Sequence, residues 1–433
     1  MPEAALPGLL QRLWRRGLPY GVKFGNVAIS MGVSLLLAQV GGPALLGSFA
    51  IAIQTAQIAS VPLVMGRDQL VLREVAGSLR AGRRGEVRAR IALALRGVGL
   101  AGLAGAVLFA MAVLALDGAG VTLAGDPALL AGAGFVLANC LYLLGLGTVR
   151  GLGLTLQGQV YEGIYQLPLA LILLWMLLQA QSISALTAVG LATLFLLASL
   201  AMLFWRAHAH MRGWPADAAA PTATLREGGP LMLAQLTVWA GQWLPLFLAG
   251  LLGSQAQAGG FRAAWQLAFP LLIIHTTTGA TRSAAYAGDL SQGRPDLARK
   301  RLQRDRVVGA GLGLVLALPI LIWPGPILGF LFGAAFAGNE GVVQAFALVH
   351  LGTLAMGPIG SLIAMSGRTR ELLPASLISL AVQLAIGLLG WAQLGLMALV
   401  WGFAAAQLIR ISWGMLTVRR ILATAHSAPQ GQS

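Results

Sequence analysis

The side chains best suited to chemistry in this chain are a few charged and amide groups inside long apolar stretches. Arg262 lies near the start of one such stretch, and Gln266 follows four positions later, so a helix would place both on one face. Charged groups within a membrane are costly and commonly mark binding sites. We therefore favour an Arg262 that faces the interior of the protein as a candidate functional residue. The alternative is an arginine that extends to the membrane surface.

Further polar or amphipathic side chains extend this candidate site. Lys23 and Asn26 lie one helical turn apart in the first apolar stretch, and Lys23 is close enough to its end to reach the membrane surface instead. Gln54 and Gln266 occupy equivalent places in two repeated segments. This favours a polar cavity shared by the two halves over simple hydrogen bonds between helices. The remaining members of the predicted site are Gln235, Gln242 and Trp243.

The sequence lacks the patterns expected of an enzyme or a metal site. Glu162 could carry a coupling ion, although we favour the alternative of a carboxylate at the membrane interface. There is no Walker A loop, no pair of carboxylates on an outward loop and no His, Asp or Glu cluster with metal spacing. Cys140 is the only cysteine, which excludes an internal disulfide. We therefore expect no enzymatic activity, no cofactor and no bound metal.

The composition predicts the elements that hold these side chains. Hydrophobic residues make up 57% and charged residues 10% of the chain, against about 25% charged residues in a typical soluble domain. Apolar segments long enough to cross a bilayer recur along nearly the whole length. Because a chain in lipid must satisfy its backbone hydrogen bonds within each segment, we predict an all-α, multi-pass membrane protein.

We predict twelve transmembrane helices, six in each half. The expected parts are an N-terminal cytoplasmic amphipathic segment without a cleavable signal peptide (1–19), an N-terminal lobe (20–205), a cytoplasmic linker (206–227), a C-terminal lobe (228–420) and a disordered cytoplasmic tail (421–433). The predicted spans are 20–40, 44–65, 91–116, 126–147, 159–179, 183–205, 229–252, 258–281, 307–332, 341–365, 372–392 and 397–418.

The basic residues indicate which loops face the cytoplasm. The net charge is +15, and Lys and Arg gather in alternate connections, above all in 67–90 and 282–306. The opposite connections contain neither Lys nor Arg. The positive-inside bias therefore places both termini in the cytoplasm. The basic balance thus reflects topology and attraction to anionic lipid headgroups, and we expect no binding of nucleic acid.

A repeated segment indicates that the two halves are homologous. A-G-x-L-x-x-G-R at 76–83 is echoed at 287–294 by the A-G-D-L-S-Q-G-R segment. Such repeats define the architecture of a chain. Because each half has an even number of predicted spans, the halves would share one orientation about an axis along the membrane normal, as in transporters with parallel repeats. The other identical pairs are Gly41 and Gly253, Gly47 and Gly259, Phe49 and Phe261, Gln54 and Gln266, and Ala56 and Ala268.

Three stretches carry a family resemblance. They are G-G-P-A-L-L-G-S-F-A at 41–50, running on to M-G-R-D-Q-L-V-L-R-E-V-A at 65–76; Arg150-Gly151 with the polar residues after it; and S-G-R-T-R at 366–370, leading to L-G-L-M-A-L-V-W-G-F-A-A-A at 394–406. These stretches resemble the polysaccharide biosynthesis (oligosaccharide flippase, Wzx-like) family of the multidrug/oligosaccharidyl-lipid/polysaccharide (MOP) exporter superfamily. The resemblance covers almost the full chain.

The resemblance implies a two-lobed fold of twelve helices in the bacterial inner membrane. It implies movement of sugar units linked to a polyprenyl (undecaprenyl) diphosphate from the cytoplasmic to the outer leaflet. Basic residues in an inner cavity would hold the diphosphate or an acidic glycan, a role that Arg262 matches and Lys23 matches more loosely. The implied partners are membrane lipid, the lipid-linked glycan, a polysaccharide polymerase and chain-length proteins.

Three other functions remain as alternatives. A multidrug or metabolite exporter of the same superfamily would need an acidic residue deep in a span to exchange protons or sodium for a cationic substrate, and none lies at mid-membrane. A major facilitator transporter is partly matched by the loop at 77–84, which lacks that family's acidic residue. A sugar-repeat polymerase would need a sizeable outward loop with arginine and acidic residues, whereas the outward connections here are short.

Overall fold

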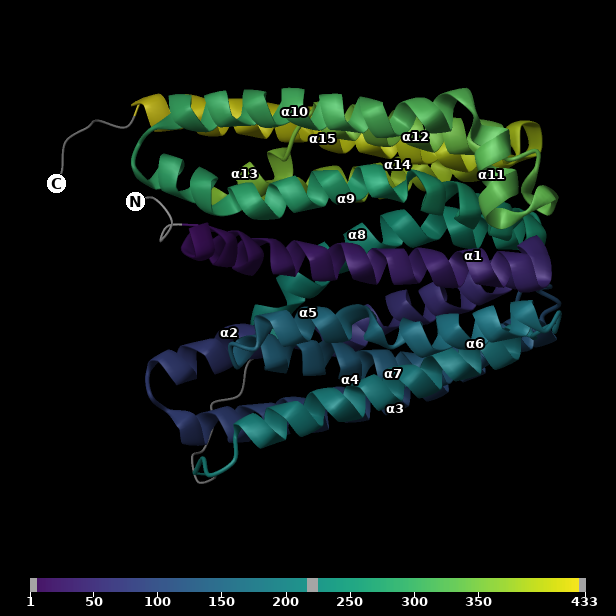
Figure 1. Cartoon of the computed structure of the whole chain (residues 1–433), viewed down its shortest axis with the longest axis horizontal. Helices are drawn as coiled ribbons and strands as arrows, with labels where there is room; N and C mark the ends of the chain where they lie inside the picture. Colours follow the sequence, from purple (N-terminus) through teal and green to yellow (C-terminus); the bar gives the residue numbers. More distant parts are fainter. Residues whose placement is uncertain (1–5, 216–224, 428–433) are drawn as a thin grey trace. The chain divides into compact units, whose positions relative to one another are not determined.

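The computed structural model describes residues 6–215 and 225–427, and within these ranges the chain is helical without strands. Two short 3-10 turns, Ala334–Phe336 and Thr369–Glu371, interrupt the helices. The helices are α1 (Leu6–Val64), α2 (Arg67–Arg80), α3 (Arg84–Gly118), α4 (Pro127–Gly151), α5 (Thr155–Ile164), α6 (Gln166–Leu178), α7 (Ala185–His210), α8 (Leu225–Leu252), α9 (Gln255–Ser291), α10 (Pro295–Ile322), α11 (Pro324–Phe332), α12 (Glu340–Ala355), α13 (Ile359–Met365), α14 (Leu372–Leu394) and α15 (Leu396–Ser427) (Figure 1).

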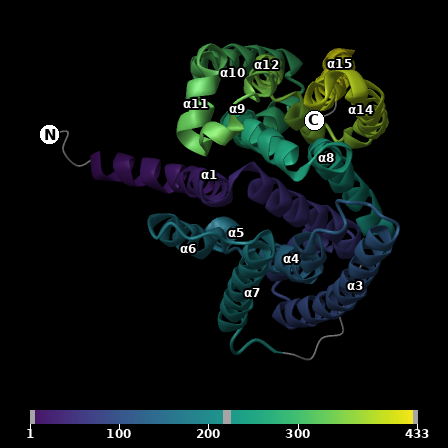
Figure 2. The ribbon, with the colours of Figure 1, turned by 90° about the vertical axis from the view of Figure 1, so that its right-hand side faces the viewer.

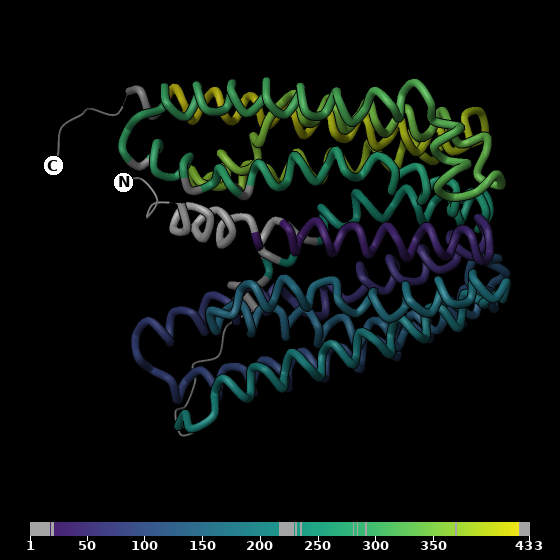
Figure 3. Tube along the Cα trace, viewed as in Figure 1, coloured from purple at the N-terminus to yellow at the C-terminus, as the bar shows by residue number. Residues whose placement is uncertain are grey.

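The first helix contains two membrane-length runs joined at one glycine. Gly42 has φ +72° and ψ −167°, a non-helical conformation that glycine adopts without strain at Cβ. The part of α1 from Gly21 to Val64 has 44 residues, which would extend about 66 Å as one straight helix. That length is about twice the hydrocarbon thickness of a bilayer. The chain instead turns back at this glycine, between the predicted spans 20–40 and 44–65 (Figure 3).

The helices confirm an all-α, multi-pass membrane fold, but their count does not confirm twelve spans. Eight described helices are long and apolar enough to cross a membrane, or nine if the bent pair α12 and α13 forms one span. Three features account for the lower count. The helix Gly21–Val64 holds two membrane-length runs on either side of its break. The apolar part of α8, Leu236–Leu252, is shorter than a full span, and α9 is not among the eight helices.

The chain divides into two compact units, Met1–Leu236 and Thr237–Ser433, with the boundary inside α8. In the first unit, α4 packs against α1, α2, α3 and α7 and is the most enclosed helix (Figure 2). Gly147 allows α4 to approach α2, since a Cβ there would lie 2.3 Å from the Asp68 carbonyl oxygen. By contrast, α3 exposes large apolar side chains such as Leu100 and Leu108, which suits contact with lipid.

In the second unit, α9 packs against α10, α12 and α13, and α15 joins the α14 hairpin to α12 and α13. Figure 2 views α10, α12, α14 and α15 nearly end-on. At the polar end, the buried Asp305 carboxylate accepts hydrogen bonds from Arg282 Nε at 3.0 Å and from the Tyr286 hydroxyl at 2.9 Å. Arg301 Nε lies 2.6 Å from Asp289 Oδ2. These contacts within the basic segment 282–306 link the end of α9 to α10.

The repeated A-G-x-L-x-x-G-R segments form the same turn in both units. Gly82 and Gly293 have φ of +72° and +63°, a left-handed conformation that favours glycine. The next amide donates five residues back in each copy: Arg83 N to the Ser78 carbonyl at 2.9 Å, and Arg294 N to the Asp289 carbonyl at 2.8 Å. The following helix, α3 or α10, begins directly afterwards. The sequence repeat is thus also a repeat of backbone geometry.

The ends of the predicted parts differ from the helix ends. In the predicted amphipathic segment 1–19, α1 begins at Leu6 and continues without a break to Gly42, and residues 1–5 lie outside the described range. The predicted disordered tail 421–433 is helical as far as Ser427, because α15 continues to that residue. Residues 428–433, and 216–224 of the linker, lie outside the described ranges. The lobe boundaries themselves stay predictions.

Candidate functional site

The N-terminal half of α9 carries the leading sequence candidates. The Ser254 hydroxyl caps the helix by accepting from Gln257 N at 3.2 Å, and Arg262 and Gln266 follow on one helical face. Gln266 is buried, with 4% of its surface exposed, whereas Arg262 is half-buried. Within the described part of the chain, Arg262 forms no hydrogen bond and no ion pair. Its guanidinium therefore keeps its donors available for an anion.

Trp265 anchors a buried aromatic cluster beside these two residues. Its ring centroid lies 5.2 Å from that of Phe346, 5.3 Å from His350 and 5.1 Å from Phe403, and every pair is close to edge-to-face. This geometry is favourable because the positive edge of one ring meets the negative face of another. The cluster joins α9, α12 and α15 and so fixes the helix from which Arg262 and Gln266 project.

His350 is the unusual member of the cluster. It has no exposed surface, and neither of its ring nitrogens has a hydrogen-bond partner in the described part of the chain. A buried polar group without a partner costs about 1–3 kcal/mol. A phenylalanine would fill a similar space among Trp265, Phe346 and Phe403 without that cost. The histidine is therefore a candidate for a functional contact.

A second polar cluster links α8, α14 and α15. Gln383 Nε2 donates to the Gly241 carbonyl oxygen at 2.8 Å. A Cβ on Gly241 would lie 3.3 Å from Arg410 Nη1 and 3.8 Å from Gln383 Oε1, so the missing side chain gives both groups room. Gln383 Oε1 and Arg410 Nε lack hydrogen-bond partners among the described residues. The cluster thus offers a guanidinium and an amide with unused hydrogen-bonding capacity.

His350, Gln383 and Arg410 were missed by the sequence prediction. Each lies within a predicted span, at 341–365, 372–392 and 397–418 respectively. The principle that selected Arg262, that ionisable groups inside a membrane are functional candidates, applies equally to His350 and Arg410. The signal was therefore present in the sequence. Their unsatisfied hydrogen bonds could be recognised only from the tertiary contacts.

The candidates on α8 lie on a helix shared by the two units. Gln242 is half-buried, and Trp243 stacks on Phe247 with ring centroids 4.6 Å apart. The side chain of Gln235 lies outside the described part of the structure. Gln242 and Trp243 follow directly after Gly241, which contacts the Gln383 and Arg410 cluster. Their predicted place in a substrate cavity remains a prediction.

In the first unit, Asn26 has a structural partner. Its Nδ2 donates to the Gln159 carbonyl oxygen at 2.6 Å, which ties α1 to α5. Gly163 admits this contact, because a Cβ there would lie 2.5 Å from Asn26 Cγ. Lys23 is exposed. Its exposure is consistent both with a place in a cavity and with a side chain that extends to the membrane surface. Gln54 is half-buried.

Glu162 forms an ion pair with Arg150. Arg150 Nη2 lies 2.8 Å from Glu162 Oε2, and the two side chains are 27% and 49% exposed. The pair joins the end of α4 to α5 near the surface of the unit. The charge of this carboxylate is already balanced by Arg150 and reached by solvent, so binding a coupling ion would stabilise it less than an isolated carboxylate within the membrane. Its proposed part in ion coupling stays a prediction.

The two clusters of the second unit could bind an anion but could not readily perform acid-base catalysis with carboxylates. Their polar members are arginine, glutamine and histidine, and none of them is acidic. Among the described residues, no group of three or more His, Cys, Asp or Glu side chains is placed to hold a metal ion. The chemistry on offer is therefore recognition of negative charge by donors in an apolar setting.

A scan of protein-family models finds no match for this chain, nor does a search of curated proteins. Solved structures do match. The chain is similar to an inward-facing multidrug resistance MATE family transporter of the MOP superfamily, with TM-score 0.73, 13% identity and coverage of 95% of this chain and 99% of that one. For the outward-facing form, the TM-score is 0.61 with 14% identity and 95% of each chain covered.

The chain is also similar to the lipid II flippase MurJ in an inward closed conformation. The TM-score is 0.66 at 13% identity, over 94% of this chain and 90% of that one. The matched structures are those of multidrug transporters and of a flippase. At these identities the likeness concerns architecture: the chain has the fold of the MOP superfamily transporters.

Proposed function

We propose that this chain is a flippase of the Wzx-like kind, which moves a polyprenyl-diphosphate-linked oligosaccharide across the bacterial inner membrane by alternating access. One observation carries the proposal: a fold similar to that of MOP transporters and a lipid II flippase holds half-buried arginines in its apolar helices. Arg262 has no partner in the described chain, and Arg410 Nε has none either.

The physical task explains why such arginines would be kept. A flippase must carry a polar, anionic headgroup across an apolar barrier while the polyprenyl tail stays in lipid. An unpaired arginine within a membrane costs about 2.5–3.5 kcal/mol or more. A diphosphate would offset this cost, because its oxygens accept paired, charge-assisted hydrogen bonds from the guanidinium fork. Gln266, Gln383 and His350 are 4%, 3% and 0% exposed in this structure, so they would reach the diphosphate or the sugars in a different state of the alternating-access cycle.

The proposal includes twelve spans with both termini in the cytoplasm. Its support is the break of α1 at Gly42, the apolar helix Leu236–Leu252 in α8 and the length of α9, which together would raise the span count. The positive-inside distribution of Lys and Arg supports the orientation. Two lobes of six helices each would follow, as the repeat predicts.

A multidrug exporter is the second candidate, because the highest TM-score among the structures described above belongs to a MATE transporter. Charge argues against it. A cationic drug would be repelled by Arg262 and Arg410. Of the acidic groups near span ends, Asp126 caps α4, Glu340 begins α12 and Glu162 pairs with Arg150. The fold likeness gives no support to a major facilitator transporter.

Export of a lipid-linked glycan by single variants tests the proposal. Arg262→Ala and Arg410→Ala should each reduce transport in proteoliposomes and in cells by about tenfold or more, the loss expected for one charge-assisted hydrogen bond. The control is Arg80→Ala, which removes an exposed arginine at the end of α2. Normal export by both Arg262→Ala and Arg410→Ala, at wild-type protein levels, would exclude these residues from the mechanism. Transport of organic cations instead of glycan would favour the exporter.

A further inference from the structure

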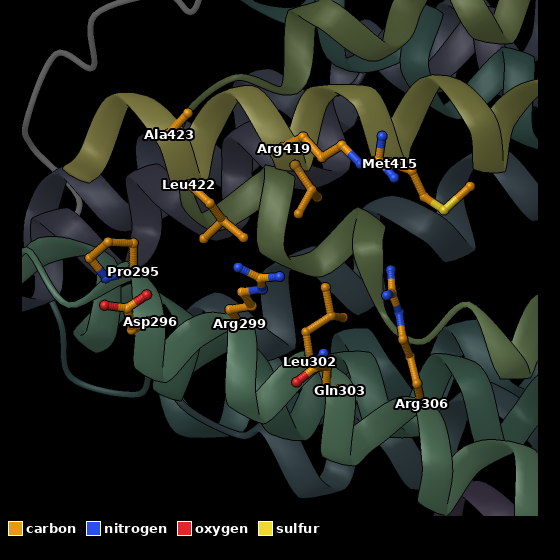
Figure 4. A pocket seen from close by; sticks show the side chains of 11 residues that line it. Pro295, Asp296, Arg299, Leu302, Gln303, Arg306, Met415, Arg419, Leu422 and Ala423 are labelled. Carbon is orange, nitrogen blue, oxygen red and sulfur yellow. The ribbon is translucent and has the colours of Figure 1, made fainter. Parts of the chain in front are cut away.

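A separate basic pocket lies at the polar ends of α10 and α15, away from the two clusters described above. It has a volume of about 750 Å³ and is bounded by Arg299, Gln303 and Arg306 of α10 and by Met415 and Arg419 of α15. Figure 4 shows Arg299 and Arg306 reaching from α10 toward α15, which carries Arg419. The volume falls within the range of small-molecule sites, about 300–1,000 Å³.

The charges in this pocket do not balance. Three arginines and one carboxylate, Asp296, line it. Within the described part of the chain, Arg299 and Arg419 form no ion pair and no hydrogen bond, although Asp296 lies only three residues before Arg299. The single carboxylate therefore offsets only part of the positive charge in the pocket. An anion bound among the arginines would offset the remainder.

One of the three arginines is held in place by the break between α12 and α13. Arg306 Nε donates to the Met356 carbonyl oxygen at 2.9 Å. Gly357 has φ +69°, and a Cβ there would lie 2.8 Å from Arg306 Cγ. The fit leaves the end of the guanidinium directed into the pocket (Figure 4). The base of the pocket is rigid, since Leu302 and Val418 belong to the buried core of this unit.

The pocket lies where α10 changes from charged to apolar. Between Pro295 and Arg306 the helix carries seven charged residues (Asp296, Arg299, Lys300, Arg301, Arg304, Asp305 and Arg306), and the next two side chains, Val307 and Val308, are 74% and 51% exposed. Such a transition is typical of the membrane interface, where headgroup phosphates lie. Leu302, Met415, Val418 and Leu422 give the pocket apolar walls beside the arginines.

We propose that this pocket binds a phosphate group through Arg299, Arg306 and Arg419. Convergent guanidinium groups suit a tetrahedral phosphate, which has several charged oxygens to share among the donors. The phosphate belongs either to an anionic phospholipid headgroup at the cytoplasmic surface or to a soluble phosphate compound. The apolar walls fit the glycerol and upper acyl region in the first case. The site is independent of Arg262 and Arg410 and of whichever substrate they bind.

Binding to the purified full-length protein tests this site with two probes. Native mass spectrometry in detergent would compare phosphatidylglycerol with phosphatidylcholine, and calorimetry at fixed ionic strength would measure inorganic phosphate. We expect Arg299→Gln and Arg419→Gln each to weaken binding of the phosphate-bearing probe by about tenfold. Arg304→Gln is the matched control, because it removes one positive charge from the same helix outside the pocket.

The outcomes distinguish the two sources of phosphate. Selective loss of phosphatidylglycerol binding in the pocket variants identifies a lipid site, and selective loss of inorganic phosphate binding identifies a site for a soluble compound. A double variant, Arg299→Lys with Arg419→Lys, keeps the charge and should recover only part of the affinity, because lysine lacks the fork. Binding of both probes at wild-type strength by the two Gln variants would overturn the proposal, as would an equal loss in Arg304→Gln. Thermal melting of each variant identifies any that fails to fold.

Discussion

The two repeated segments, 41–83 and 253–294, end in the same backbone turn and differ in the polar groups that they carry. Both have a helix break near the start and the glycine turn at Gly82 or Gly293, but the first copy breaks again at Met65 and Gly66 (φ +54° and +68°), whereas α9 of the second copy is continuous. At the position equivalent to Arg262, 212 residues earlier, the first copy has Ala50, which is 4% exposed. The scaffold therefore does not require a basic residue there.

Two serines of the first copy form hydrogen bonds to other helices of their unit. The Ser48 hydroxyl donates to the Asp126 carboxylate, which caps α4, and Asn139 Nδ2 donates to the Ser60 hydroxyl at 2.6 Å. Ser48 corresponds to Gly260 in the second copy, which has no such donor. The second unit instead contains His350 and Arg262 without partners in the described chain. The two copies therefore differ at the position of Arg262, where only the second carries a guanidinium, and that group has no partner in the described chain.

Introducing the arginine into the first copy should give the largest effect. Ala50→Arg would bury an unpaired guanidinium in a packed helix face, at a cost of about 3 kcal/mol or more. We expect a large loss of monodisperse protein and a lowered melting temperature in detergent. The reciprocal Arg262→Ala should keep or raise the melting temperature, because it removes an unpaired guanidinium. An equally stable Ala50→Arg protein would show that the two positions are not distinguished by their surroundings.

The turn glycines should show how far the copies are alike. Gly82→Ala and Gly293→Ala would each force a Cβ into the left-handed region, at a cost of about 1–2 kcal/mol. No atom lies within 4 Å of either added Cβ, so backbone strain would be the whole effect. Thermal melting should therefore fall by similar amounts in both variants. A clear inequality would mean that the two turns are not equivalent in energy.

Sequence patterns predicted the helices and revealed the repeated segment, whose turn the structure then showed, because both depend on local chemistry. Apolar length defines a span, and a glycine with its neighbouring amides defines the turn at Gly82. The bond from Asn26 to the Gln159 carbonyl could not be predicted, since it joins residues 133 positions apart. The unsatisfied nitrogens of His350 depend likewise on three helices packing together. At the site, the residue type alone identified Arg262 as a candidate and could have identified Arg410. Only the packing shows which of these groups have hydrogen-bond partners.

A smaller effect is expected from exchanging buried polar groups. Ser60→Ala would leave the Asn139 amide without its partner and cost about 0.6–2 kcal/mol.

His350→Phe would keep the ring contacts and remove an unpaired polar group, so stability should stay constant or rise by about 1 kcal/mol while glycan export falls. Melting temperature and export measured on the same preparations separate the two effects. A strong destabilisation by His350→Phe would assign His350 to packing instead.

The smallest effect should come from the ion pair of the first unit. Glu162→Gln removes the attraction to Arg150, and partly exposed pairs of this kind contribute about 0–1 kcal/mol. We expect little change in melting temperature and normal export across a range of pH. Loss of export in a stable Glu162→Gln protein would instead support a role for Glu162 in carrying the coupling ion.

The most direct measurement of the central claim is the affinity of the purified protein for a polyprenyl diphosphate relative to the uncharged polyprenol. We predict that the wild type prefers the diphosphate by about tenfold or more. Arg262→Ala combined with Arg410→Ala should remove this preference while leaving polyprenol binding unchanged and the melting temperature at or above that of the wild type. The Arg80→Ala protein should behave as the wild type. An undiminished preference for the diphosphate in the double variant would contradict the claim that the unpaired arginines of the second unit hold the substrate.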